Sequence, residues 1–127
     1  MSGVVIIHKL LTTAAPVPAA NIFSGYVPDG IKPAICITQV SGDPRNTLQM
    51  AGRVFVTERV QLTIYAAKYA QAKSIIAACR SALPLSHKFV GSFECEAILP
   101  DCDGPDMYDE QTQLHEQSLD FIVKFLR

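Results

Sequence analysis

Few side chains in this sequence are well suited to act as nucleophiles, bases or soft metal ligands. They are His8, His87 and His115, together with Cys36, Cys79, Cys95 and Cys102. No two histidines have the spacing of a helical metal pair, and no two cysteines have the C-x-x-C spacing of a zinc or thioredoxin-like site. The one nucleophile–base pair to consider is Cys79 with His87, but Cys79 lies on the apolar stripe of a predicted helix. We therefore expect no catalytic residue, no metal ligand and no bound cofactor.

The four cysteines differ in their neighbours. Apolar residues lie close to Cys36, Cys79 and Cys95 in the sequence (Ile35, Ile37, Ala78 and Ala97), which suits buried free thiols in a protein made in a reducing cytoplasm. Cys102 lies in a polar segment, where we expect its thiol to be exposed to solvent.

Acidic residues are concentrated between residues 100 and 112, and they could in principle bind a hard cation. They are Asp101, Asp103, Asp106, Asp109 and Glu110. A calcium-binding loop needs acids at its first, third and fifth positions and a glutamate at its twelfth. Counted from Asp101, the fifth position is Pro105 and the twelfth is Thr112. The segment is therefore predicted to be a solvated loop or a charged contact with a partner, not a metal site.

Overall composition excludes several classes of function. Hydrophobic residues make up 49% of the 127 residues and charged ones 18%, which is typical of an ordered globular chain. The formal net charge of -1 does not suggest a protein built to bind nucleic acid, because phosphate binding needs clustered lysines and arginines. The apolar start at residues 1–11 is too short to span a bilayer, and its only cation, Lys9, follows the apolar run. We expect neither membrane insertion nor sequence-specific DNA binding.

Apolar periodicity predicts two helices and four strands that would position these side chains. The helices are expected at 4–14 and 69–83, and the strands at 34–40, 54–66, 92–99 and 113–126. The first segment begins with Val-Val-Ile-Ile, which would also suit a strand. The clearest helix has Ala72, Ile76 and Cys79 on one side, and the strand at 54–66 alternates between apolar and polar residues. Residues 45–53 are predicted to form a projecting loop.

The predicted fold is a single α+β domain covering residues 1–127, with the element order α-β-β-α-β-β. The simplest arrangement is a four-stranded, mainly antiparallel sheet with both helices on its apolar face. The opposite face is expected to be polar and to carry Gln61, Thr63, Glu94, Glu96, Ser118 and Asp120.

Three segments, in this order along the chain, resemble the tail-terminator or tail-completion proteins of long-tailed bacteriophages. The first is the proline-led strand and turn at 33–42 (PAICITQVSG). The second is the strand at 59–66 (RVQLTIYA), followed by a helix that begins YAQA and ends CRSAL. The third is 108–112 (YDEQT), which leads into 117–123 (QSLDFIV). The resemblance covers most of residues 33–125.

This resemblance implies a structural role in virion assembly, without a cofactor. Such proteins close into a ring, commonly a hexamer, on the last ring of the tail tube at the head–tail junction. They stop growth of the tube and provide the surface that joins the head or neck connector, while DNA only passes through the ring. Assembly would take place in the host cytoplasm. Another neck or head–tail joining protein of the same particle, or a small cellular α+β binding module, is the alternative.

Two groups of residues are candidates for these contacts. The first is a subunit or tube interface in the predicted loop, formed by Arg45, Leu48, Gln49, Met50 and Arg53. Its apolar members could instead fold back on the core. The second is a set of acids that would face the lumen or a partner and keep DNA from binding: Glu94, Glu96, Asp101, Asp103, Asp106 and Asp120. The alternative for the acids is plain solubility.

Overall fold

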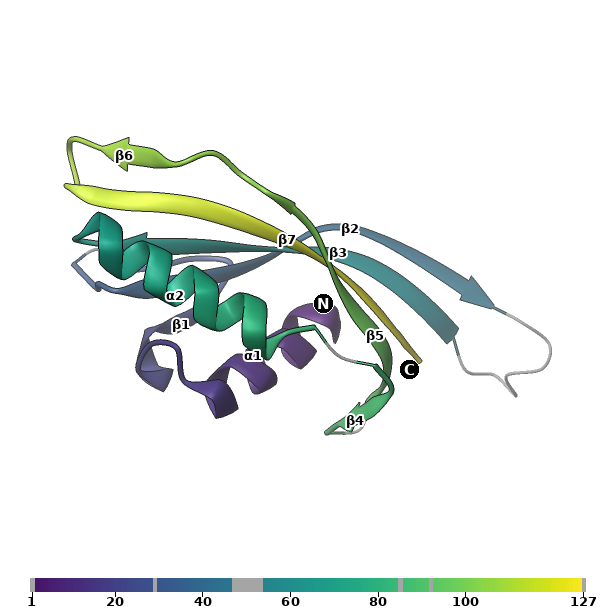
Figure 1. Cartoon of the computed structure of the whole chain (residues 1–127). Helices are drawn as coiled ribbons and strands as arrows, with labels where there is room; N and C mark the ends of the chain where they lie inside the picture. The colour runs from purple at the N-terminus through teal and green to yellow at the C-terminus, as the bar shows by residue number, and fades with distance from the viewer. Residues whose placement is uncertain (1, 29, 47–53, 85, 92, 127) are drawn as a thin grey trace.

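A computed structural model of the chain describes residues 2–28, 30–46, 54–84, 86–91 and 93–126. Within them, two α-helices pack against one mixed sheet of seven strands, which curls around them as a half-barrel (Figure 1). The elements in chain order are α1 (Ser2–Ala14), a 3-10 turn (Ala19–Asn21), β1 (Ile22–Ser24), β2 (Ala34–Asn46), β3 (Val54–Ala66), α2 (Tyr69–Ala82), β4 (Lys88–Val90), β5 (Phe93–Asp103), β6 (Met107–Asp109) and β7 (Leu114–Leu126). The α+β class is confirmed.

The expectation of four strands was wrong, because the sheet has three additional short strands. β1, β4 and β6 each contain only three residues, which is too few for an alternating pattern to be recognised. The acidic segment at 100–112 is also not simply a loop. β5 continues through it to Asp103, and β6 follows at Met107–Asp109.

β2 is longer than the sequence pattern predicts. A bulge between Gln39 and Ser41 shifts the register against β3, and pairing then continues to Asn46. The bulge interrupts the alternation, so the pattern stops at Val40 although the strand does not. Pro44 is tolerated because β1 pairs only with residues 35–37, which leaves this part of β2 at the edge of the sheet. Arg45 therefore lies in a strand and not in the predicted loop.

The strand order is β1-β2-β3-β7-β5-β4, with β6 also paired to β7. The β1–β2 pair is parallel and the other pairs are antiparallel. β7 is the last strand in the sequence, yet it lies between β3 and β5. Its register with β3 places Ser118 opposite Thr63 and Asp120 opposite Gln61.

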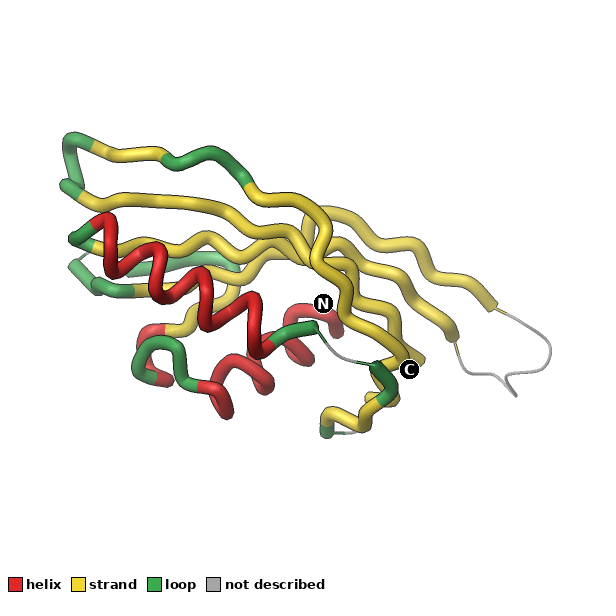
Figure 2. Tube along the Cα trace, in the orientation of Figure 1, coloured by secondary structure: helices red, strands yellow, loops and turns green. Residues whose placement is uncertain are grey.

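Both helices lie on the same side of the sheet, as expected (Figure 2). α1 buries Val4, Ile7 and Leu11, which recur at helical spacing, although its Val-Val-Ile-Ile start would also suit a strand. Packing on the sheet therefore outweighs the weak helix propensity of its β-branched residues. α2 buries Ala72, Ile75, Ile76 and Cys79. Neither helix is long and apolar enough to cross a membrane.

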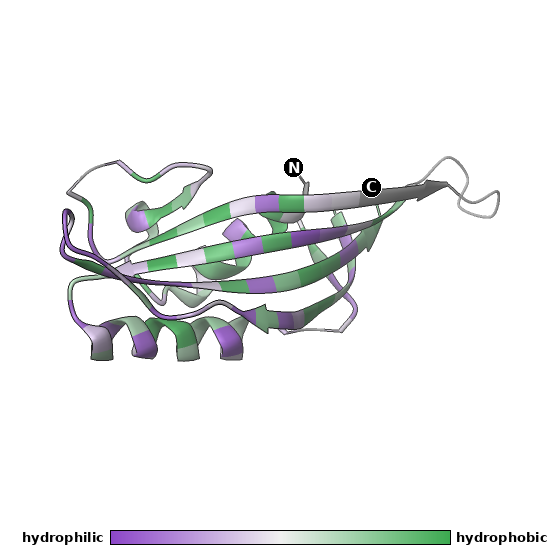
Figure 3. Cartoon of the chain, turned by 90° about the horizontal axis from the view of Figure 1, so that it is seen from above, coloured by the Kyte–Doolittle hydropathy of each residue, from purple (hydrophilic) through white to green (hydrophobic). Residues whose placement is uncertain are grey.

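The side of the sheet that faces away from the helices is here called the outer face. Figure 3 views the chain from this side and shows hydrophilic and hydrophobic positions mixed along the long strands. All six residues expected on the polar face are half-buried: Gln61, Thr63, Glu94, Glu96, Ser118 and Asp120. On the helix side, Val60, Leu62, Phe121 and Val123 are almost completely buried.

Candidate functional site

The predicted interface loop lies largely outside the described residues. Leu48, Gln49, Met50 and Arg53 belong to segment 47–53, which connects β2 to β3. Arg45 pairs with Phe55 close to the ends of these two strands. The assignment of the segment to a subunit or tube contact therefore stays a prediction.

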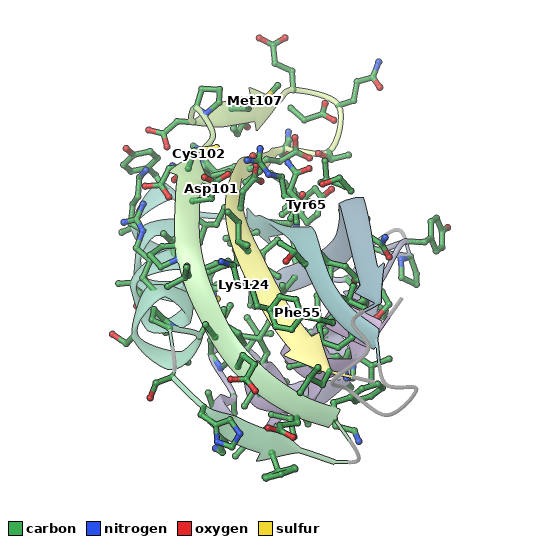
Figure 4. The ribbon with its side chains drawn as sticks, turned by 90° about the vertical axis from the view of Figure 1, so that its right-hand side faces the viewer. Phe55, Tyr65, Asp101, Cys102, Met107 and Lys124 are labelled. Atoms are coloured by element: carbon green, nitrogen blue, oxygen red, sulfur yellow. The ribbon has the colours of Figure 1, made fainter. Side chains whose placement is uncertain are left out.

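Arg59 brings together two of the predicted acids on the outer face. Its guanidinium lies 2.5 Å from a carboxylate oxygen of Asp101 on β5 and 3.8 Å from one of Asp120 on β7. The Cys102 thiol donates to Asp120 at 3.4 Å, and this hydrogen bond is the main reason that the pKa of Cys102 is raised. Figure 4 labels Asp101 and Cys102 side by side at one end of β5. The cluster links three neighbouring strands.

Asp103 and Asp106 hold the segment between β5 and β6 against α2. Asp103 forms an ion pair with Arg80, and Asp106 accepts hydrogen bonds from Lys73 at 2.5 Å and from the Tyr69 hydroxyl at 2.8 Å. The hydrogen bond from Lys73 is the main cause that lowers the pKa of Asp106. The same bond raises the pKa of Lys73. These contacts form a tether between a helix and a strand connection.

The remaining two acids of the predicted set meet a histidine. His87 Nε2 lies 2.8 Å from Glu94 Oε2 and 4.0 Å from Glu96 Oε1. The His87 ring also packs edge-on against Phe89 of β4, with 5.5 Å between ring centroids. One nitrogen and two oxygen donors could bind a divalent cation, but the same geometry is also that of a hydrogen-bonded contact between a surface histidine and carboxylates, so the arrangement alone assigns no metal.

All six predicted acids thus have a cationic or imidazole partner from the same chain within 4.0 Å. The sequence pointed to the acids but not to Arg59, Lys73, Arg80 and His87. Those partners come from β3, from α2 and from the residue just before β4, so only the folded chain brings them near the acids. Much of the acidic charge is locally compensated.

The Cys79–His87 pair considered from the sequence is not formed. Cys79 is completely buried, and burial raises the pKa of its thiol to about 12, so the thiol stays protonated at neutral pH and is a poor nucleophile. His87 instead pairs with Glu94. Cys36 and Cys95 are also buried and Cys102 is exposed, which confirms the expected positions of all four thiols.

Two concave regions lie at separate places on the surface. A cavity of about 520 Å³ lies between the 25–32 loop and the outer face, where Cys36, Tyr65 and Glu116 line it. Burial and, to a lesser degree, the charge of Asp109 raise the pKa of Glu116. A second, more open groove of about 510 Å³ runs between α1 and β4. Sequence patterns missed this groove because its wall, β4, is only three residues long.

Comparisons with known proteins agree with a role in a phage-like particle. The family model of the tail completion protein gp17 matches residues 5–125. A chain in the solved structure of the virion of a native gene transfer agent (GTA) particle superposes with a TM-score of 0.65. That chain is 13% identical in sequence, and the match covers 95% of this chain and 92% of the other, so it shows a shared fold. No curated protein matches this sequence.

Proposed function

The chain belongs to the tail completion protein gp17 family, a family of structural virion proteins. We propose that it closes into a ring of identical copies, a hexamer, on the end of the tail tube. The ring stops tube growth and presents a surface to the head or neck connector. Family membership also confirms that the chain is not an enzyme. The observation that carries the proposal is that the family match extends over almost the whole chain.

The surface chemistry supports a role in assembly. Asp101, Asp103, Asp106 and Asp120 form ion pairs that link different elements. The buried thiol of Cys79 is protonated and therefore unsuited to nucleophilic chemistry. Three strands of 13 residues each (β2, β3 and β7) give a long, stiff sheet whose outer face is half-polar. Such a face can line a channel without binding what passes through it.

The outer face is our candidate for the lumen of the ring, through which DNA passes without sequence-specific binding. This face carries the cations Arg59 and Lys124, and two carboxylates already engage Arg59. A guanidinium in that position offers little to a DNA phosphate, because binding would first have to break the ion pairs. In this arrangement Asp101 and Asp120 prevent DNA binding by occupying the guanidinium of Arg59. Glu94 and Glu96 occupy the imidazole of His87 in the same way.

The 47–53 segment remains our candidate for the contact with a neighbouring subunit or the tail tube protein. It carries Leu48 and Met50 among polar residues and connects the ends of the two long strands β2 and β3. A pair of apolar side chains at such a position could insert into a partner surface.

Electron microscopy of particles that lack this protein tests the proposal. We expect headless tails of uncontrolled length, because nothing would stop tube growth or join the tube to the head. Tails of normal length that fail to join heads would instead point to a neck protein. Normal, complete particles would refute both roles.

A further inference from the structure

The groove between α1 and β4 combines an exposed aromatic ring with positive charge. Phe89 is 64% exposed, although it belongs to a strand, and Leu10 and Val90 also line the groove. Lys9 and Lys88 provide two ammonium groups, and the Lys9 side chain lies against Gly91. No acid occurs among the described residues that line the groove. It is suited to an apolar segment that carries negative charge.

β6 has the complementary chemistry. Met107 is 59% and Tyr108 52% exposed, and the acids Asp109 and Glu110 follow directly. The segment is also held in place before any partner binds. The Tyr108 ring packs on His115 with 4.7 Å between centroids, and the Gly104 amide donates to the Ser118 carbonyl at 2.7 Å. A pre-ordered segment loses little conformational entropy on docking.

The groove and β6 lie too far apart to meet within one chain. β6 pairs with the start of β7, where Tyr108 is opposite His115. β4 pairs with Glu94 of β5, which is opposite Leu126 at the end of β7. At ~3.3 Å per residue, the two positions on β7 are about 36 Å apart. Figure 1 shows β6 and β4 at opposite ends of the molecule.

We propose that β6 of one copy docks into the α1–β4 groove of the next copy. Met107 lies against Phe89, and Glu110 approaches Lys88. A contact between two different patches is heterologous, and its repetition closes a ring when the rotation between copies is right. This inference rests on the proposed ring and specifies which surfaces form it.

Charge exchange provides the sharpest test. Ring formation by full-length variants is measured by chemical cross-linking and mass photometry. Each variant is tested by itself in solution and after addition to tail tubes purified from particles that lack this protein. Lys88→Glu and Glu110→Lys should each raise the concentration needed for half-assembly by about tenfold. The double variant should recover most of that loss, because the ion pair is restored with its signs reversed. Lys32→Glu, at another exposed lysine, is the matched control.

Removal of the apolar contact provides a second test. Phe89→Ser and Met107→Ser should each weaken the ring by about tenfold, whereas Leu99→Ser, an exposed leucine on β5, should not. Thermal unfolding followed by circular dichroism checks that every variant is folded. A covalent test uses Phe89→Cys with Met107→Cys in a Cys102→Ser chain. Oxidation should give a ladder of linked subunits that neither single cysteine gives.

The outcomes separate this inference from the function on which it rests. Wild-type protein that forms no ring, alone or on tubes, would overturn the proposed function. Rings that form normally in the Phe89→Ser and Met107→Ser variants, with no charge rescue, would overturn only the β6–groove contact. Variants that form rings but no longer bind tubes would assign the groove to the tube protein instead of a second copy, and would also overturn the inference.

Discussion

Glu58 is a charged residue on the buried side of β3, where only 3% of its surface is exposed. Its Oε1 accepts a hydrogen bond of 3.1 Å from the Gly3 amide in the first turn of α1. Amides in that turn have no partner within the helix, and the helix dipole favours a negative charge there. The carboxylate therefore joins the start of the helix to the sheet. Gly3 permits this close approach, because a Cβ at that position would lie 2.6 Å from Glu58 Oε1.

We predict that Glu58→Ala lowers the free energy of unfolding by about 1–3 kcal/mol, because it leaves the Gly3 amide buried without an acceptor. Glu58→Gln should cost less, since its amide oxygen can still accept the bond. Urea denaturation measures both, with Thr57→Ala on the outer face as a control. Equal stability of the Ala and Gln variants would show that the hydrogen bond contributes little.

Thiol reactivity provides a second prediction at the scale of residues. One thiol, that of Cys102, should react with a disulfide reagent in the native protein at pH 8, and four should react in denaturant. Because the hydrogen bond to Asp120 is the main cause of the raised pKa of Cys102, Asp120→Asn should increase the thiolate fraction and speed the reaction. An unchanged or slower rate in that variant would contradict the assignment.

The position of the connection from β5 to β6 depends on a few individual polar contacts. Lys73 and Tyr69 of α2 hold Asp106, and the Gln117 side-chain amide donates to the Gly104 carbonyl at 2.9 Å. The contacts with α2 keep a short strand in a defined position at the end of the sheet. The same strand carries the exposed Met107 and Tyr108.

The tether predicts a specific pH dependence. Since the pKa of Asp106 is lowered in the folded chain, its contribution to stability is present above the unfolded pKa and is lost as pH falls through the folded one. In an NMR titration, Lys73→Met should move the Asp106 midpoint up toward its ordinary value. Amide exchange in β6 should become faster in the same variant. Lys68→Met, at an exposed lysine just before α2, is the control, and equal midpoints in both variants would contradict the tether.

The periodicity of apolar residues in the sequence predicts the long helices and strands correctly. The helix at 69–83 and the strands at 54–66 and 113–126 agree with the structure to within a residue. The short strands β1, β4 and β6 could not be predicted, because three residues carry no period. The extension of β2 was hidden by its bulge and by Pro44, which in most strands would end the pairing.

The candidate site was predictable only in part, for a related reason. The acids could be identified because charge is visible in the sequence, whereas their partners depend on the sheet order. Arg59 meets Asp101 and Asp120 because β7 lies between β3 and β5. The contact of Glu58 with α1 could have been anticipated, because Glu58 is a charged residue among the otherwise apolar alternating positions of its strand.

For the whole molecule, the balance of charge on the outer face has a consequence for DNA transit. If this face lines the lumen, Asp120→Lys should release Arg59 from one carboxylate and add a cation next to it. We expect slower genome ejection, measured by the release of DNA from particles over time, and a smaller effect for Asp120→Asn. Unchanged ejection in the lysine variant would remove this face from the lumen.

The position of β7 between β3 and β5 also affects how the protein is made. Ribosomes release this strand last among the described elements, so the β2–β3 pair and the β4–β5 hairpin emerge earlier, each with an unsatisfied edge. Neither can complete its hydrogen bonding until the final strand inserts between them. A chain interrupted before residue 114 would lack the centre of its sheet and would be a substrate for proteases. The sheet is therefore complete only once β7 has inserted between β3 and β5.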